Sequence, residues 1–517
     1  MSDISVDYLV IGAGPAGLQL ARLLETGGHD YLVIEAADAP GSTFATFPRH
    51  RRLISINKPH TGSDDPEFNL RMDWNSLLSE DPELLFTKYS ERYFPDADDY
   101  VRYLTDFAAA YALRIRYGSR IVRVARDGPG FTVTDDQGRA YRTRRVVVAT
   151  GVSRPNIPPI PGIETAEQYS TVSVDPREFT GQRVLIIGKG NSALETANNL
   201  LETAAVIHVA GPSPLEFAWK THFVGHVRAV NNNFLDTVQL KSQNALLDAR
   251  VVHLEKKDDA YRVQFKFTVA TVEHTYDRVI VCTGFRFDPS IFDENCLPRL
   301  ALDDRFPELT PAYESADVPG LYFAGTLTQQ LDFKKSSNGF IHGFRYAARA
   351  LYHVLEQRHH DRLWPHRELP AFARDLAAHT VSRINRSSGL YQQYGNLADL
   401  LVVGSAGPAR YYEELPVGYL HDDAFDHRGH AFAITLEYGP DDDGDPFTPR
   451  LSSAVLGKGY IDGPLHPVVR HYHRGELVTT LHLPDDLENL WTRPDLHVEP
   501  LEALFTQAVP AAAPAHR

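Results

Sequence analysis

Two glycine-rich segments in this sequence have the residue types and spacing that bind a dinucleotide. The first is GAGPAG at residues 12–17, and the second is GKGNSA at residues 188–193. Glycines at these positions allow a tight turn and a close approach of the backbone to a pyrophosphate, and the following helix adds free N–H groups and a positive dipole end. Two such loops predict two dinucleotides, and the simplest chemistry for such a pair is a flavin reduced by a nicotinamide.

The first loop lies in a complete strand–helix–strand pattern. Residues 6–11 form a short apolar run, residues 16–25 have helical spacing, and residues 31–34 are apolar again. Glu35 ends the second apolar run, where an acid hydrogen-bonds a ribose hydroxyl in such units. The pattern predicts that the first loop binds FAD.

The second loop follows an apolar run at residues 184–187, and its third glycine is replaced by Ala193. No acid ends the next apolar run, at residues 206–209, whereas Ser213, Lys220 and Arg228 follow it. Without an acid for the 2′-hydroxyl, the segment favours a 2′-phosphate and therefore NADP, with a simple polar turn as the alternative.

Three apolar runs end in small residues and glycine. Ala149-Thr150-Gly151 follows residues 146–148, Cys282-Thr283-Gly284 follows residues 278–281, and Gly325 closes GLYFAG at residues 320–325. Strands with such ends let a dinucleotide pass close to the backbone. The matching ends at 149 and 282 predict that the chain leaves the first dinucleotide-binding domain and returns to it.

The order of elements predicts an α/β fold with two Rossmann-like three-layer dinucleotide-binding domains and a C-terminal α+β domain rich in strands. We expect a discontinuous FAD-binding domain at residues 1–160 and 283–360, an NADP-binding domain at 161–282, and a C-terminal domain at 361–517. Residues 40–100 lack a clean period, which fits either an insertion over a cofactor or an ordinary long loop.

Composition limits the remaining classes. The 517 residues carry a formal net charge of −15, and no basic stripe suggests nucleic-acid binding. The two cysteines, Cys282 and Cys296, form no Cys-x-x-Cys, which excludes a disulfide scaffold, a zinc ribbon and a vicinal dithiol. The sequence shows neither a secretory signal nor an apolar run of membrane-spanning length, so we expect a cytoplasmic protein away from membranes. The sequence does not determine the oligomeric state, and a homo-oligomer is compatible with it.

Two other clusters invite a metal interpretation. The acidic run Asp441–Asp445 is followed by Pro446 where a calcium loop needs glycine, so we expect a solvated hairpin there. Five histidines near the C-terminus allow a metal site, but we expect them at the surface: His421, His427, His430, His471 and His473. We therefore predict no metal.

The order GxGxxG, ATG, GxGxxA, CTG and GLYFAG resembles the class B flavin monooxygenases, which include flavin-containing and N-hydroxylating enzymes, over about residues 1–360. A closer resemblance, to the family of the endoplasmic reticulum flavoprotein associated with degradation, covers nearly the whole chain. It rests on RRLISINK (51–58), FNLRMDWNSLL (68–78), THFVGHVRAVNN (221–232), DFKKSSNGFIHGFRYAARA (332–350) and LHPVVRHY (465–472), among other segments. Tyr169 stands nearest the place of the histidine in the usual class B linker.

The resemblance implies roles for individual residues. Those holding the adenylate and pyrophosphate of FAD would be Gly12, Gly14, Gly17 and Glu35, and those along the flavin Thr150, Gly151, Gly325 and Thr326. Those holding the nicotinamide dinucleotide would be Gly188, Gly190, Asn191 and Ser192. The predicted cofactor-binding set also includes Pro15, Ala16, Ala36, Val122, Ser213, Thr283, Gly284 and Phe333.

Asn57 and Lys58 are the predicted catalytic residues. Asn57 lies near the place of an amide that supports the oxygenated flavin in flavin-containing monooxygenases, and its alternative role is loop hydrogen bonding. The resemblance implies that NADPH reduces the flavin, that O₂ gives a C4a-(hydro)peroxyflavin, and that one oxygen passes to a nucleophilic nitrogen or sulfur of a small molecule. N-hydroxylation is the favoured reaction. The alternatives are electron transfer to a protein or thiol partner and a purely structural flavin.

Overall fold

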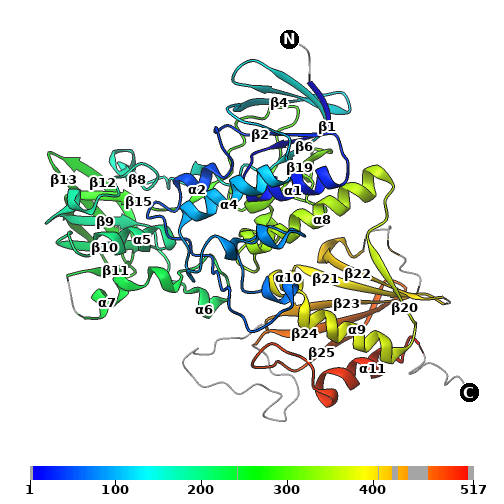
Figure 1. The fold of residues 1–517 in the computed structure, drawn as a ribbon. Helices are drawn as coiled ribbons and strands as arrows, with labels where there is room; N and C mark the ends of the chain where they lie inside the picture. The colour runs from blue at the N-terminus through cyan, green and yellow to red at the C-terminus, as the bar shows by residue number, and fades with distance from the viewer. Residues whose placement is uncertain are drawn as a thin grey trace, which may run out of the picture.

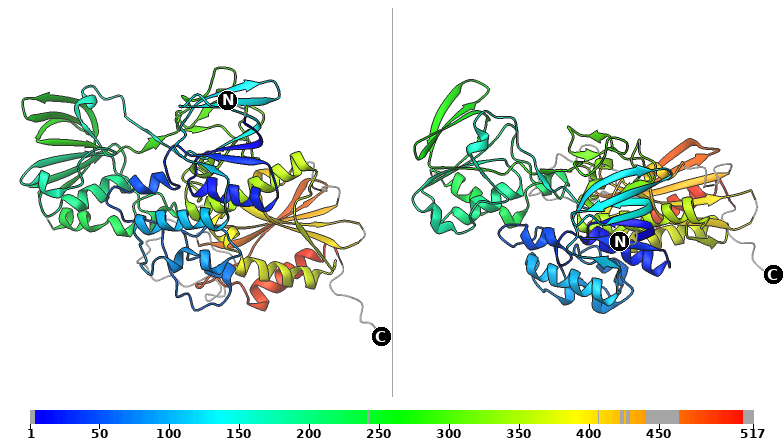
Figure 2. Two further views of the ribbon diagram at one scale, coloured as in Figure 1. Left: turned by 45° about the horizontal axis from the view of Figure 1, so that its top comes forward. Right: turned by 90° about the horizontal axis from the view of Figure 1, so that it is seen from above.

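The computed structural model describes residues 4–240, 243–405, 407–421, 425, 429–439 and 464–509. Its three largest sheets are two with parallel cores and one that is antiparallel (Figure 1). The first sheet lies between the other two, which occupy opposite ends of the molecule (Figure 2). The predicted fold class, two dinucleotide-binding α/β units with a strand-rich C-terminal unit, is confirmed.

The first sheet has the order β3-β2-β1-β6-β5-β4, with β19 pairing β6. Its strands are β1 (Ile4–Ile11), β2 (Tyr31–Ile34), β3 (Ile115–Arg116), β4 (Ile121–Asp127), β5 (Gly130–Asp135), β6 (Ala140–Val148) and β19 (Leu321–Phe323). The core strands are parallel and buried on both faces, which is why they read as continuous apolar runs. Helices α1 (Pro15–Thr26) and α8 (Ile341–His360) pack together against this sheet.

The second sheet is fully parallel, in the order β11-β10-β9-β15-β8. Its strands are β8 (Glu167–Gln168), β9 (Arg183–Ile187), β10 (Val206–Gly211), β11 (Ala245–Asp248) and β15 (Arg278–Val281). Alternate side chains of β9 pack against helix α5 (Asn191–Leu200) on one face. The other face is covered by the antiparallel sheet β12 (Arg250–Lys257), β13 (Ala260–Lys266) and β14 (Thr271–Tyr276).

The aperiodic segment between β2 and β3 is an ordered insertion rather than an open loop. It contains α2 (Ser42–Thr46), α3 (Pro66–Asn69), α4 (Ala97–Ala110) and 3₁₀ turns at Pro82–Leu84 and Phe86–Lys88. Buried aromatic side chains hold it together, among them Phe86, Tyr100 and Tyr103. The Tyr103 hydroxyl accepts a hydrogen bond from the Leu77 amide at 2.7 Å, so the aromatic cluster also fixes the backbone that follows Trp74.

The C-terminal sheet is antiparallel, in the order β20-β22-β21-β23-β24-β25. Its strands are β20 (His366–Leu369), β21 (Leu397–Val403), β22 (Ala409–Pro416), β23 (His430–Glu437), β24 (His466–His473) and β25 (Glu476–His482). Along β23, Ala431 and Ala433 belong to the core that includes α8, whereas Phe432 and Ile434 belong to the core beneath α9 (Ala373–Arg386) and α11 (Glu499–Phe505). This period of two places the sheet between α8 and the α9–α11 pair (Figure 1).

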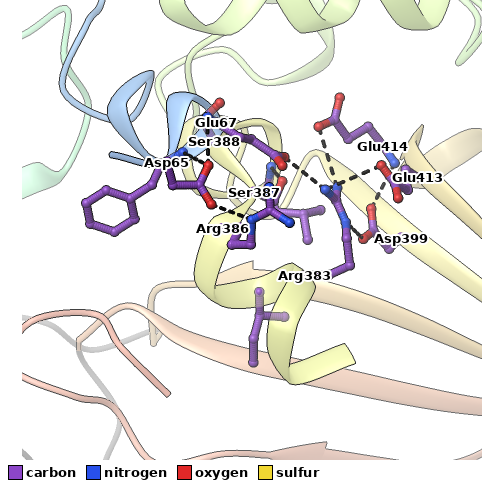
Figure 3. Close-up of polar contacts among 12 residues, drawn as sticks. Asp65, Glu67, Arg383, Arg386, Ser387, Ser388, Asp399, Glu413 and Glu414 are labelled. Atoms are coloured by element: carbon purple, nitrogen blue, oxygen red, sulfur yellow. Dashed lines mark hydrogen bonds and ion pairs between the residues drawn. The ribbon is translucent and has the colours of Figure 1, made fainter. Parts of the chain in front are cut away.

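A charged cluster joins this C-terminal unit to the insertion (Figure 3). Arg383 of α9 lies within 2.9 Å of Glu67 in the insertion, 3.1 Å of Asp399 on β21 and 3.3 Å of Glu413 on β22. Glu414 approaches the same guanidinium at 3.7 Å. We call Arg383 and these four carboxylates the Arg383 cluster.

Within the described residues, no helix combines the length and apolarity needed to cross a membrane.

Candidate active site

One cavity of about 350 Å³ opens to both glycine loops. Residues 14–16 of the first loop line it, together with the strand ends at 149–152 and 325–326. Asn191, Ser192 and Glu195 line it from the second loop and the start of α5. The two predicted dinucleotide sites therefore share one space, as transfer between two cofactors requires.

The backbone of the first loop fits a bound pyrophosphate. Gly12 has a φ of +106°, and a Cβ there would lie 2.8 Å from the carbonyl oxygen of Ala149. Gly17 packs directly on the Gly12 carbonyl, whereas a Cβ at Gly14 would meet nothing within 4 Å. Gly12 and Gly17 are thus required for close packing, and Gly14 faces open space beside the N-terminus of α1.

The second loop repeats this construction. Gly188 has a φ of +123° and packs against the carbonyl of Cys282, while Gly190 faces open space. The carbonyls of Ala149 and Cys282, at the two matching strand ends, therefore contact the first glycine of the loop in each unit. Both loops fit the dinucleotides that the sequence predicts.

Glu35 lies at the edge of the first loop and is 5% exposed. One carboxylate oxygen accepts the Ala13 amide at 2.7 Å, and the other accepts the Ala37 amide at 2.9 Å and the Ser42 hydroxyl at 3.3 Å. These bonds hold the carboxylate between the first loop and α2, and its contact with a ribose stays a prediction.

Asn191 uses its whole amide inside the protein. Its Nδ2 donates to the carbonyls of Gly225 (3.1 Å) and His226 (2.8 Å), and its Oδ1 accepts from the Arg228 amide (3.1 Å) and Asn231 (2.9 Å). Asn191 therefore positions residues 225–231, in addition to lying in the second loop. The sequence could not show this, because the partners lie in an aperiodic segment.

The end of β10 differs from its sequence interpretation in two respects. Lys189 forms an ion pair with Asp248, at the end of the neighbouring strand β11, and donates to the Ser213 carbonyl at 2.9 Å. Arg228, which the sequence associated with a 2′-phosphate, faces the shared cavity instead. An acid thus lies near the end of β10, but it comes from another strand and is paired.

Aromatic side chains form the wall that Arg228 faces. Its Cζ lies 4.9 Å from the centre of the Trp74 ring, and Trp74 stacks on His342 at 4.1 Å with an angle of 27° between the rings. Phe340 continues the stack, 6.0 Å from His342. His342 is 2% exposed, and burial holds its pKa well below its usual range, so its imidazole is neutral.

A buried carboxyl, Glu195 of α5, also lines the cavity. The Tyr169 hydroxyl donates to Glu195 and accepts the Arg49 amide at 3.2 Å, and Phe47 stacks on Tyr169 at 5.7 Å. Burial raises the pKa of Glu195 to about 7. Sequence reasoning noted Tyr169 but missed Glu195, because an acid within a helical segment is usually a surface residue.

Several predicted residues lie away from the cavity lining. Asn57 is buried in the insertion, where its amide donates to the carbonyls of Ser90 and Arg92, and Lys58 is exposed. Both residues, predicted to be catalytic, therefore belong to the insertion and do not line the cavity. Also outside the lining are Gly12, Gly17, Glu35, Ala36, Val122, Gly188, Gly190, Ser213, Thr283, Gly284 and Phe333. The lining does include Gly14, Pro15, Ala16, Thr150, Gly151, Asn191, Ser192, Gly325 and Thr326.

Among the described residues, one group has metal-ligating types in close array: His29, Glu356 and His360. Glu356 pairs with His29 at 2.6 Å and with Arg362 at 2.8 Å, and His360 hydrogen-bonds Tyr8 at 2.7 Å, so a polar network explains why these three side chains lie together.

The prediction that the C-terminal histidines lie at the surface was wrong for His471, which is 2% exposed and stacks on Phe432 at 4.4 Å. His427 and Asp441–Asp445 lie outside the described residues.

Two nucleotide-binding α/β units that open onto one cavity define a flavoprotein oxidoreductase with two dinucleotide-binding domains. The model of the pyridine nucleotide-disulphide oxidoreductase family matches residues 9–325. The chain is 40% identical to the FAD-dependent oxidoreductase domain-containing protein 2 of Mus musculus, over 96% of this chain and 83% of the mouse protein. The chain therefore belongs to the pyridine nucleotide-disulphide oxidoreductase family, and the expected FAD and NADP(H) are the cofactors of that family.

Monooxygenases are also among the similar proteins. The chain is 26% identical to the flavin-containing monooxygenase FMO GS-OX-like 3 of Arabidopsis thaliana, over 63% of this chain and 72% of that protein. The solved structure of a flavin-containing monooxygenase from Stenotrophomonas maltophilia has the same fold, with a TM-score of 0.54, 22% identity, and coverage of 68% of this chain and 99% of that one. The resemblance stated from the sequence is confirmed at the level of family and fold.

Proposed function

We propose that this protein is an FAD- and NADPH-dependent monooxygenase that transfers one oxygen atom of O₂ to a nucleophilic nitrogen or sulfur of a small molecule. The observation that carries the proposal is the cavity that both glycine loops and an aromatic wall share. N-hydroxylation of an amine or an amino-acid-derived metabolite is the reaction we favour, from the resemblance to N-hydroxylating enzymes.

FAD, when bound, supplies the redox chemistry. The chain contributes binding at Gly14 and the N-termini of α1 and α5, and it limits water by an apolar lining. That lining includes Phe44, Phe47, Leu53, Phe285, Phe340, Ile341 and Phe344. Substrate orientation falls to the polar groups on the aromatic wall, described below. The proposed partners are a small molecule and O₂, with neither nucleic acid nor membrane, and the protomer is proposed to act alone or as a homo-oligomer.

A second candidate function is electron transfer from NADPH to a protein or thiol partner, which the family model's name favours. Cys282 and Cys296 are 5% and 1% exposed, burial raises the pKa of both thiols, and neither lines the cavity. Buried, protonated thiols react poorly. Electrons leaving by this route would therefore have to pass directly to an external acceptor.

Isotopic oxygen separates the two candidates. The holoenzyme is mixed with NADPH, ¹⁸O₂ and panels of primary amines and thioethers, and products are analysed by mass spectrometry. We expect one ¹⁸O atom in an amine-derived product, together with NADPH consumption above the rate without substrate. Hydrogen peroxide release equal to NADPH consumed, with no labelled product from either panel, would contradict the proposal. Anaerobic reduction of a protein disulfide by NADPH would support the second candidate.

A further inference from the structure

Arg228 is a cation that faces the cavity without an acidic partner. Among the described residues no carboxylate forms an ion pair with its guanidinium, and it is only partly exposed. Burial lowers the pKa of Arg228 to about 10, which still leaves it charged at neutral pH. A half-buried charge without a counter-charge is costly, and at a cavity wall the cost is offset when an anion binds.

The backbone that carries Arg228 and the Trp74 ring that its guanidinium faces are each held by hydrogen bonds. Asn191 holds the segment 225–231 by four hydrogen bonds, one of them from the Arg228 amide. Trp74 is held by its indole Nε1, which donates to the Arg71 carbonyl at 3.1 Å. The loop around Trp74 is also bound by Arg345 of α8, which donates to the carbonyls of Leu70, Asp73 and Ser76 at 2.7–2.9 Å. The Arg228 backbone and the Trp74 ring are therefore positioned by the protein's own hydrogen bonds.

From this arrangement we infer that Arg228 and Trp74 recognise the carboxylate of an aryl or apolar acid, so that the substrate of the proposed monooxygenase is an organic anion. That the bound acid is a substrate rests on the proposed function. The binding test does not depend on that function. A guanidinium stacked on an indole keeps its N–H edge available for a planar carboxylate, which it binds with two parallel hydrogen bonds. The neighbouring rings of His342, Phe340 and Phe344 suit an apolar body.

The other source of an anion in this cavity is a phosphate of the nicotinamide dinucleotide. Each glycine loop already has a helix N-terminus for phosphate, at α1 and α5. Trp74, which Arg228 faces, and His342, which stacks on Trp74, belong to the insertion and to α8, not to the second loop. The arrangement therefore favours a carboxylate, and the experiment includes an arm for the phosphate.

The test is ligand binding to the FAD-loaded protein, followed by the change in flavin absorbance and without turnover. The probes are benzoate, phenylacetate and indole-3-acetate, each paired with its neutral amide. We expect at least one acid to bind tenfold or more tightly than its amide. Arg228→Met should abolish that preference, Arg228→Lys should reduce it, and Arg250→Met, which removes an exposed positive charge elsewhere, should leave it unchanged.

Three results would overturn the inference. In the first, no acid binds more tightly than its amide. In the second, Arg228→Met retains both its FAD content and the preference for the acid. In the third, Arg228→Met weakens NADP⁺ binding tenfold while acid binding is unchanged, which would assign Arg228 to a phosphate. The binding test involves no oxygen transfer, so a failed monooxygenase assay would not affect its result. Oxidation of neutral amines by a protein that shows no preference for acids would contradict this inference and leave the proposed function intact.

Discussion

Glu195 and Tyr169 show how a single pair of residues gives the cavity a titratable group. The carboxyl lies in α5, is 7% exposed, and accepts the Tyr169 hydroxyl, with no Lys or Arg ion pair to it among the described residues. Burial therefore outweighs the hydrogen bonds that favour the charged form, and the pKa rises to about 7 from an ordinary value of 4.5. Near neutral pH this wall of the cavity is poised between two charge states.

The raised pKa predicts a pH dependence of stability. Between pH 4.5 and about 7 the folded state retains a proton that the unfolded state has lost, so stability falls as pH rises through this window. The loss amounts to at most about 3 kcal/mol. We expect the melting temperature of the native protein to fall relative to that of Glu195→Gln between pH 5 and pH 7.5, at equal FAD content. A difference between the two melting temperatures that stays constant over this range would contradict the assignment.

Residues whose role is local could be predicted from the sequence. Gly12, Gly188 and Glu35 were found because their neighbours along the chain form the strand, the turn and the helix that define their role. Trp74 and Arg228 could not be paired, because their contact joins an insertion in the first unit to an aperiodic segment of the second. Asn57 matched a family position in sequence, yet its amide is bound to the insertion backbone, outside the lining.

Among the elements, the insertion is where the sequence said least. The strands at residues 115–150 were predictable from period-two alternation, and β23 from a short apolar run, which the structure buries on both faces. The insertion has no period-two pattern along its length, since separate buried groups hold it: a cluster of aromatic side chains and buried arginines. Arg71 is 2% exposed and donates to the carbonyls of Ile384 (2.7 Å) and Ser387 (3.3 Å) at the C-terminal end of α9.

This contact predicts that Arg71→Met destabilises the protein by about 2–4 kcal/mol, because buried carbonyls at a helix C-terminus lose a charged donor. The matched control is Arg386→Met, which removes the ion pair to Asp65 from a side chain that is 55% exposed and should cost under about 1 kcal/mol. Chemical denaturation of both variants measures the two losses. Equal losses of stability in the two variants would contradict the prediction that the buried contacts of Arg71 stabilise the protein more than an exposed ion pair does.

At the scale of the whole molecule, the Arg383 cluster ties the insertion to the C-terminal sheet (Figure 3). Asp399 is fully buried, with hydrogen bonds from the Tyr411 hydroxyl (3.0 Å) and the Glu414 amide (2.9 Å) besides its ion pair with Arg383. Burial raises the pKa of Asp399, whereas the Arg349 and Arg383 guanidinium groups hold the pKa of Glu414 below its usual value. The positive charge of Arg383 thus lies among four carboxylates where the insertion meets the C-terminal unit.

Removal of that arginine should therefore have a large effect. We expect Arg383→Met to cost about 3–5 kcal/mol, since it leaves a buried carboxylate without its counter-charge. Asp399→Asn in the same protein should restore part of the loss, because it removes that charge. Calorimetric melting of the single and double variants, with the FAD-to-protein ratio recorded for each, tests this. A double variant no more stable than Arg383→Met would contradict the charge argument.

The C-terminal unit also contacts the segment that carries Arg228. The Tyr394 hydroxyl donates to the His222 carbonyl at 2.6 Å, and the His222 ring stacks on Tyr438 at 3.8 Å. Since Arg71 binds this unit as well, the loops that carry Arg228 and Trp74 both have anchors in the C-terminal unit, besides those at Asn191 and Arg345. Substitutions at Tyr394, or at the end of α9 that binds Arg71, can accordingly alter one wall of the cavity while the sequence of both glycine loops stays the same.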